Sequence, residues 1–243
     1  MTHITFESGG LKLQGILSGP KQDTTKCVII AHGFMSSKEF VHWRHLSDAL
    51  NKEGIACFRF DFRGHGKSDK AEITVSGEVE DLRAAMAFIR TKGYTSIGLF
   101  GSSLGGLICF LCYDSGINTM AFLAPVSKPK NPGIINEDIL TTLKDKGSLE
   151  IKKKDGRKVV INEQYVRERQ SFDREQLLKS ISCPILINHG TADTVLPVQD
   201  SVEAMTFLNA ESSLNIVEGA DHTFRGHGNE LIEKSLSWFQ RFL

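Results

Sequence analysis

The sequence predicts a single α/β domain built on a mostly parallel, eight-stranded sheet with helices on both faces. Short apolar segments rich in β-branched residues alternate along its 243 residues with longer segments of helical period. This order favours parallel strands joined by right-handed helical crossovers. Several of the strands are apolar throughout, which is typical of strands covered on both faces. Glycine-containing loops follow these strands, at the sheet edge where open α/β sheets bind ligands.

The first expected element is an antiparallel hairpin, because 2–6 and 11–17 alternate in polarity on either side of Gly9-Gly10. Later segments follow the alternating order of strands and helices. The expected strands are 27–31, 55–60, 96–100, 119–123, 184–189 and 213–217, and the expected helices are 42–53, 75–92, 104–113, 198–208 and 229–242.

The alternation is interrupted once, between residues 126 and 182. A Pro/Gly cluster at 128–133 precedes an expected helix at 134–146, and Asp155-Gly156 predicts a hairpin of 149–154 and 157–161. Two short helices, 163–169 and 174–181, are expected next. Long insertions between sheet strands are usually functional. We therefore expect a lid at 126–182, with 1–125 and 183–243 as the two parts of one core.

We expect the apolar residues of the helix at 134–146 to face the substrate. Its candidate pocket residues are Ile134, Ile135, Ile139, Leu140 and Leu143. The alternative is that they only anchor the lid to the body. The basic run at 152–158 has two interpretations, attraction of anionic substrates or a solvated hairpin tip, and the second is favoured.

Charge and composition narrow the classes of partner. Lys+Arg and Asp+Glu both number 29, so no broad basic field for nucleic acid is expected. A small neutral or weakly charged molecule is the expected partner, with the oligomeric state, a homodimer included, left open. The chain shows neither a leader pattern at its start nor an apolar run of membrane-spanning length, which predicts a cytoplasmic protein.

The five cysteines lie in or beside apolar runs without the spacing of a disulfide framework, so reduced core residues are expected. Cys109 and Cys112 form C-x-x-C inside an apolar segment rather than at the start of a helix, which disfavours a redox role. No metal site and no cofactor are predicted.

The motif G-x-S-x-G occurs at the junction of the strand 96–100 and the helix that begins at Leu104. Only Ser103 has glycine on both sides at the required spacing, at Gly101 and Gly105. Such a turn holds a nucleophilic serine in a strained conformation and needs small neighbours. The helix start directs backbone N–H groups at the serine, so the Leu104 N–H is a candidate oxyanion donor.

Two further loops adjoin the same sheet edge. His32-Gly33 follows the strand 27–31, and the Phe34 N–H is a second candidate oxyanion donor, with a plain tight turn as the alternative. The loop 61–68 contains Gly-His-Gly but too few ligands for a metal. We expect this loop to be structural, with Asp61 and Arg63 bonding to backbone or to each other.

The base and its orienting acid are sought in the last loops of the core. Asp193 follows the strand 184–189, and His222 follows the last strand. A carboxylate so placed fixes the tautomer of a histidine. His227 is the rival base, but His222 meets the order Ser, Asp, His with the histidine soon after the last strand. His32 and His189 precede glycine turns and are expected to bond to backbone.

In combination these motifs resemble the α/β-hydrolase family of serine hydrolases, from about Leu11 to the C-terminus. The segments that carry the resemblance are 32–34, 61–68, 101–106, 190–193 and 219–222. Within that family the chain is most similar to small carboxylesterases, including cinnamoyl and feruloyl esterases and monoacylglycerol-lipase-like enzymes. The resemblance implies Ser103 as nucleophile, His222 as base and Asp193 as orienting acid, with Phe34 and Leu104 forming the oxyanion hole.

These residues predict hydrolysis of carboxylic esters with small apolar or aromatic acyl groups through an acyl-enzyme. Peptidase or thioesterase activity remains an alternative because the same triad serves them. Dehalogenase and epoxide hydrolase chemistry is disfavoured by the serine at position 103. A non-catalytic binding protein is the other alternative, disfavoured because each expected triad residue is present.

Overall fold

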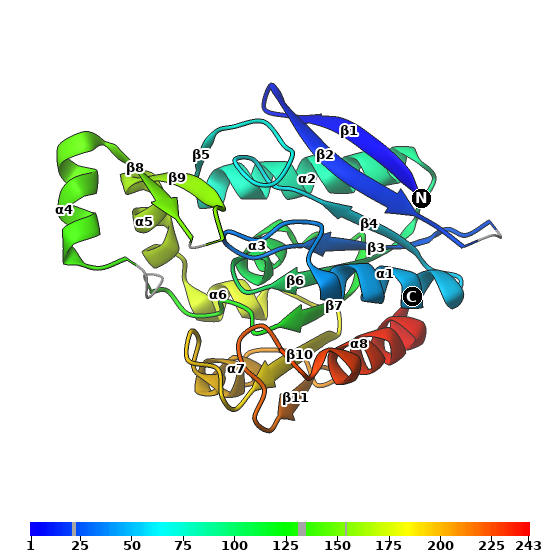
Figure 1. Cartoon of the computed structure of the whole chain (residues 1–243). Coiled ribbons are helices and arrows are strands. Elements are labelled where there is room, and N and C mark those ends of the chain that lie inside the picture. Colours follow the sequence, from blue (N-terminus) through cyan, green and yellow to red (C-terminus); the bar gives the residue numbers. More distant parts are fainter. Residues whose placement is uncertain (21–22, 131–134, 154) are drawn as a thin grey trace.

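The computed structural model describes residues 1–20, 23–130, 135–153 and 155–243, and its main feature is one large sheet (Figure 1). The strands run in the spatial order β1-β2-β4-β3-β6-β7-β10-β11. The pairs β1–β2 and β2–β4 are antiparallel, whereas the pairs from β4 to β11 are parallel. The predicted eight-stranded, mostly parallel sheet is therefore confirmed. Its strands are Thr2–Ser8 (β1), Leu11–Ser18 (β2), Lys26–Ala31 (β3), Ala56–Phe60 (β4), Ser96–Ser102 (β6), Ile117–Leu123 (β7), Ile185–Gly190 (β10) and Ser213–Val217 (β11).

Helices cover both faces of this sheet. The side chains of β3 alternate between two apolar clusters, because successive residues of a strand point to opposite faces. Val28 and Ile30 pack in the cluster that contains the buried residues of α1 and α8, whereas Ile29 packs in the cluster of α2 and α3. The helices of the core are Val41–Lys52 (α1), Val75–Thr91 (α2), Leu104–Cys112 (α3), Val198–Met205 (α7) and Gly228–Phe242 (α8).

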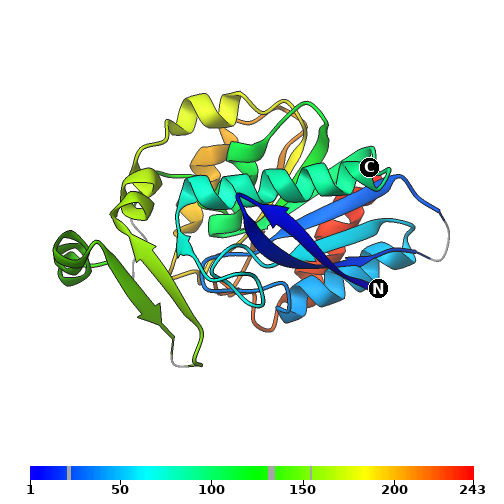
Figure 2. The same cartoon turned by 90° about the horizontal axis from the view of Figure 1, so that it is seen from above.

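The unit of elements between β7 and β10 comprises Glu137–Lys146 (α4), Ser148–Lys152 (β8), Lys158–Asn162 (β9), Glu163–Gln170 (α5) and Arg174–Lys179 (α6). Of these, α4, β8, β9 and α5 lie at one end of the large sheet, on the left in Figure 1 and again in the view from above (Figure 2). The predicted hairpin is present as the antiparallel pair β8–β9. Strand β9 also pairs in parallel with Glu72–Ile73 (β5), a pairing that the sequence pattern did not predict.

Polar side chains set where the helices of this unit begin. Asn136, Asn162 and Asp173 each accept a hydrogen bond from the backbone N–H three residues later, at 3.0 Å. Such caps satisfy a helix donor that has no partner within the helix. The helix expected at 134–146 therefore begins later, at Glu137, after its cap.

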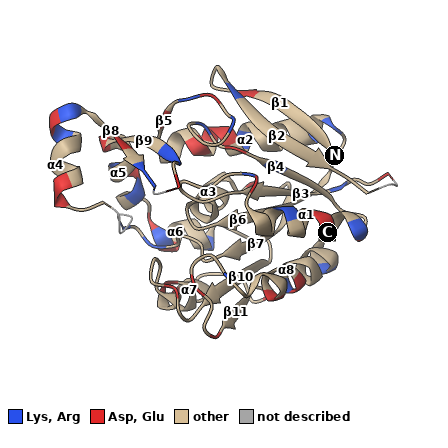
Figure 3. Ribbon diagram, viewed as in Figure 1, with Lys and Arg blue, Asp and Glu red and all other residues tan. Residues whose placement is uncertain are grey.

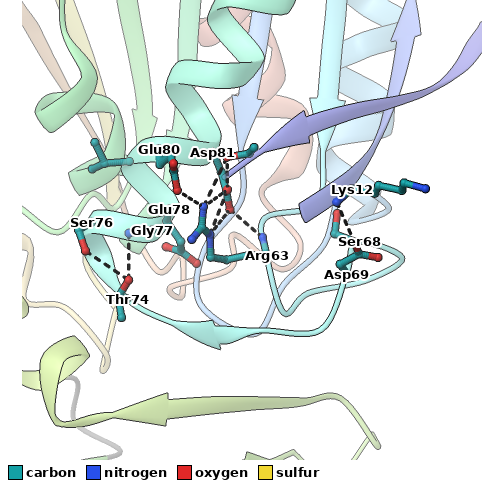
Figure 4. Close-up of polar contacts among 12 residues, drawn as sticks. Lys12, Arg63, Ser68, Asp69, Thr74, Ser76, Gly77, Glu78, Glu80 and Asp81 are labelled. Carbon is teal, nitrogen blue, oxygen red and sulfur yellow. Dashed lines mark hydrogen bonds and ion pairs between the residues drawn. The ribbon is translucent and has the colours of Figure 1, made fainter. Parts of the chain in front are cut away.

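The loop after β4 is structural, as expected. Asp61 is buried and accepts hydrogen bonds from the backbone N–H groups of Lys38 and Lys67, and it pairs with the Lys38 ammonium. Arg63 does not bond to Asp61, an option the sequence analysis left open. Its guanidinium instead bonds to Asp81 and Glu80 of α2 (Figure 4). Asp61 and Arg63 therefore hold the loop through separate ion pairs.

The cysteines lie in the interior. All five are free and buried, as the sequence predicts. Burial raises the pKa of the Cys57 and Cys112 thiols to about 12, which disfavours the reactive thiolate. Among the described residues, no helix is both long and apolar enough to cross a bilayer.

Candidate active site

Ser103 lies in a strained turn between β6 and α3. Its φ of 52° and ψ of −115° are unusual for a residue with a side chain. The backbone is locked there by three hydrogen bonds: the Ser103 N–H donates to Leu123 O at 3.0 Å, and Ser103 O accepts from Gly106 and Val126. Ser103 is partly exposed, whereas Ser102 is buried at the end of β6. The turn has the geometry that the G-x-S-x-G motif predicts.

Glycine is required at Gly105 because α3 crosses close to the end of β3. A Cβ atom at this position would lie 2.2 Å from Ala31 O and 2.6 Å from His32 O. A Cβ at Gly101 would lie 2.8 Å from Gly105 O. These contacts are too short for any side chain, so the two glycines allow the strand and the helix to approach each other.

Asp193 and His222 meet across two loops of the core. His222 Nδ1 donates to Asp193 Oδ2 at 2.7 Å. Burial raises the pKa of Asp193, but hydrogen bonds from His189 and His222 outweigh this effect and hold the pKa well below its usual range. Asp193 is therefore ionised at neutral pH. Helix α1 also stabilises the loop that carries His222, because the ring of His42 in α1 forms a hydrogen bond with Thr223 O at 3.0 Å.

His189 is a second histidine at the same carboxylate. Its Nε2 lies 3.2 Å from Asp193 Oδ2 and 3.0 Å from Leu196 O, while its Nδ1 contacts the Ser201 hydroxyl at 2.7 Å. The expected backbone bond is present, but the contact with Asp193 was not predicted. His227, the rival base, precedes α8 as its N-cap.

Ser103 and His222 together border two cavities. The larger one, of about 520 Å³, is also lined by both predicted oxyanion residues, Phe34 and Leu104. The smaller one, of about 130 Å³, includes Phe34 and Trp43 in its wall. Ligand sites commonly have volumes of about 300–1,000 Å³. The larger cavity can hold a substantial substrate group, and the smaller one only a small group.

The loop that carries Phe34 is fixed by two buried histidines. His32 donates from Nδ1 to Gly33 O and accepts the Phe62 N–H at Nε2. His65 donates from Nδ1 to Arg63 O and accepts the Met35 N–H. Both patterns need a neutral ring. Burial lowers the pKa of His32 and, further, that of His65, so both rings remain neutral at pH 7.

The predicted pocket helix lies elsewhere. Leu143 and Ile135 are buried in the apolar core, and Ile139 and Leu140 pack against it. None of these four is among the residues that line the two cavities at Ser103. Helix α4 contacts β8 and α5 instead, which belong to the same 126–182 segment. Ile134 lies outside the described residues.

Other residues of the 126–182 segment line the larger cavity, and the sequence pattern did not predict them. Tyr165 and Arg169 of α5 line it, together with Val126, Lys130 and Lys153. Tyr165 stacks on Phe34 with ring centroids 5.6 Å apart. The basic hairpin residues are also at the site, because Lys153 borders both cavities and Arg157 borders the smaller one. Arg157 donates to Met35 O at 2.7 Å, so it is more than a solvated tip.

Comparison with known proteins identifies a family and several relatives of this chain. A family model described as "Serine aminopeptidase, S33" matches residues 22–175. Caffeoylshikimate esterase of Arabidopsis thaliana is 26% identical over 257 residues, which covers 90% of this chain and 75% of that protein. The uncharacterized protein YfhR of Escherichia coli K12 is 25% identical over 221 residues, which covers 88% and 70% of the two chains.

Among solved structures, Est1E from Butyrivibrio proteoclasticus with ferulic acid bound has a TM-score of 0.85 and 26% identity, covering 98% of both chains. The Est1E structure without that ligand has a TM-score of 0.81 and 23% identity, covering 99% of this chain and 98% of that one. The chain therefore belongs to the serine aminopeptidase S33 family of α/β-hydrolases.

Proposed function

We propose that the protein is a serine hydrolase that cleaves carboxylic esters through an acyl-enzyme. The observation that carries the proposal is the Asp193–His222 hydrogen bond at the cavity that Ser103 also lines. The similarity to caffeoylshikimate esterase and to Est1E with ferulic acid supports an ester as the substrate. The proposal extends to apolar or aromatic acyl groups, since Phe34 and Tyr165 form an aromatic wall of the larger cavity.

In the proposed mechanism, Ser103 Oγ attacks the ester carbonyl while His222 Nε2 takes the hydroxyl proton. Asp193 holds the imidazole with its proton on Nδ1 and stabilises the imidazolium that forms. The Phe34 and Leu104 N–H groups stabilise the oxyanion. His222 then protonates the leaving alcohol, and a water molecule that it activates releases the acid from Ser103.

We assign residues 1–125 and 183–243 to the catalytic core and 126–182 to a lid over it. Support comes from Lys153, Tyr165 and Arg169, which lie in this segment and line the cavity at Ser103. The lid then determines which substrate group fits, while the core supplies the chemistry.

A panel of matched substrates tests the proposal. The purified protein is assayed with acyl esters, the corresponding acyl-CoA thioesters and peptide amides, including amides with a free amino terminus. The expected result is that kcat/KM for esters exceeds that for amides. Preferential cleavage of amides would instead favour the peptidase activity that the family description names. A protein inactive on the whole panel would contradict hydrolase function.

A further inference from the structure

We propose that the larger cavity at Ser103 binds a carboxylate of the substrate through the guanidinium of Arg169. The substrate class is then an ester with an apolar spacer and an anionic group at its far end. This inference rests on the proposed ester hydrolysis and specifies its substrate. It departs from the neutral or weakly charged molecule that the balanced composition predicts.

Arg169 is a buried cation without a partner in the part of the chain that the structure describes. Its exposed fraction is 2%, and its Nε and Nη1 atoms are buried without a hydrogen bond. No ion pair of Arg169 is formed with the described residues either. An unpaired buried charge is costly, and buried polar groups are nearly always hydrogen-bonded. An anionic ligand in the cavity that Arg169 lines would supply the missing counter-charge.

The nearby carboxyl groups do not neutralise Arg169. Burial lowers the pKa of Arg169, and the charges of Tyr165 and Glu78 would raise it. Burial and the neighbouring Asp81, however, raise the pKa of Glu78 well above its usual range, so this carboxyl is held towards its neutral form. Glu78 Oε2 is itself buried without a hydrogen bond. Asp81 is already bound to Arg63 (Figure 4). Neither carboxyl group therefore serves as an ionic partner of Arg169, which lines the cavity.

The wall of the cavity is cationic beyond Arg169. It includes Lys130 and Lys153 but no aspartate or glutamate among the described lining residues. Lys130 is paired with Asp200 at 2.7 Å, whereas Lys153 has no ion pair with the described residues. Burial lowers the pKa of the Lys153 ammonium, and the nearby Arg157 cation lowers it further. Basic residues also mark the β8–β9 hairpin in Figure 3. Such a wall attracts anions to the site.

Aromatic side chains line the cavity that Ser103 and Arg169 share. Tyr165 and Arg169 are one helical turn apart on α5, so they share a face. Both line the cavity, and Tyr165 stacks on Phe34 next to the oxyanion position. A ligand that reaches from Ser103 to Arg169 therefore passes an aromatic wall. An apolar spacer fits this path better than a polar one.

Pairs of chromogenic esters test the inference. The 4-nitrophenyl esters of adipic and suberic acid carry a free carboxylate, and their methyl-capped forms differ only in that charge. A second series of esters carries the free carboxylate on the alcohol part of the ester instead of the acyl part. We expect the protein to prefer the carboxylate form at least tenfold in kcat/KM in one of these series, because charge-assisted bonds in a buried site are strong. A ratio near one in both series would overturn the inference.

Variants of α5 assign the preference to Arg169. Arg169→Gln is expected to reduce the preference for the carboxylate to near one, mainly through KM, and Arg169→Lys to restore part of it. Arg167→Gln is the matched control, because Arg167 is exposed on the same helix and does not line the cavity. Its ratio should equal that of the unmodified protein. An unchanged ratio in Arg169→Gln would contradict the assignment.

Two measurements keep the inference testable if Arg169→Gln fails to fold. Lys153 is exposed, so Lys153→Gln should fold and should lower the carboxylate preference several-fold.

Binding of suberate to the Ser103→Ala protein, followed by calorimetry, needs no catalysis. Suberate binding that is at least tenfold tighter than binding of its dimethyl ester supports the anion site even if no ester is cleaved. Ester cleavage without any carboxylate preference leaves the proposed function intact and refutes the anion site.

Discussion

The two carboxylate oxygens of Asp193 have different partners. Oδ1 accepts the backbone N–H groups of Val195 and Leu196 at 2.8 and 2.9 Å. Oδ2 faces His222 Nδ1 and His189 Nε2. The backbone bonds fix the side chain, so the oxygen that orients His222 has one defined position.

Asp193→Asn is expected to lower kcat by about 10³- to 10⁴-fold with little change in the fold. The amide oxygen must take the place of Oδ1 to accept the two backbone N–H groups. The amide NH₂ then faces His222 Nδ1 and forces the proton of this ring onto Nε2, where a lone pair is needed. Steady-state kinetics together with thermal unfolding checks this. An Asp193→Asn protein that retains a tenth of the activity would contradict the role of Asp193.

The residues of the proposed triad follow from motif and chain order, whereas Tyr165 and Arg169 do not. A helical segment with several charged side chains predicts a solvated face, and arginine is seldom fully buried. The one signal in the sequence is that Arg169 follows Tyr165 by four residues, which places the two side chains on the same face of a helix. Which face of α5 meets the cavity depends on the packing of the whole segment. Sequence periodicity alone does not contain that information.

At the level of elements, the β5–β9 pair connects the 126–182 segment to the body. Ile73 and Ile161 are adjacent in the pair and buried in the large apolar cluster. Asn162 adds a hydrogen bond to Glu72 at 2.7 Å. Strand β5 has only two residues and joins a strand almost ninety residues later. So short a strand has no measurable alternation, which explains why it was not predicted.

Ile161→Ala is expected to lower the free energy of unfolding by about 2–5 kcal/mol, because it leaves a cavity in a packed core. Val160→Ala is the matched control, since the neighbouring side chain is only half-buried and points to the other face. Its effect should be about 1 kcal/mol or less. Urea unfolding measures both. A small effect of Ile161→Ala would show that the segment is not part of the cooperative core.

At the scale of the whole molecule, the order of strands and helices was predictable and their ends less so. Continuous apolar runs mark the parallel strands because both faces of the sheet are covered. The expected strand 213–217 coincides with β11, and the helix expected at 198–208 ends earlier, at Met205. Helix ends depend on caps and tertiary contacts rather than on periodicity.

The buried neutral histidines couple the stability of the molecule to pH. The pKa values of His32 and His65 are lowered in the folded state, so the unfolded chain binds more protons once the pH falls below about 6.5. Their contribution is complete above that pH and is lost as the pH falls.

The free energy of unfolding is therefore expected to decrease from pH 7.5 to pH 5, and the decrease should be shallower in His65→Gln. His45→Gln is the control, because His45 is exposed on α1 and makes no comparable buried bonds. Urea unfolding at several pH values gives the slopes. Equal slopes for His65→Gln and the unmodified protein would contradict this account.

The most direct test of the proposed mechanism is to locate the nucleophile. A fluorophosphonate probe reacts with an activated serine, and peptide mapping identifies the labelled residue. We expect the label on Ser103. Ser103→Ala should lose labelling and at least about 10³-fold in ester hydrolysis, since members of a triad act as a unit. Ser102→Ala, the matched control, should change activity less than about tenfold because its side chain takes no part in the proposed triad. A label on Ser102, or an active Ser103→Ala protein, would contradict the account.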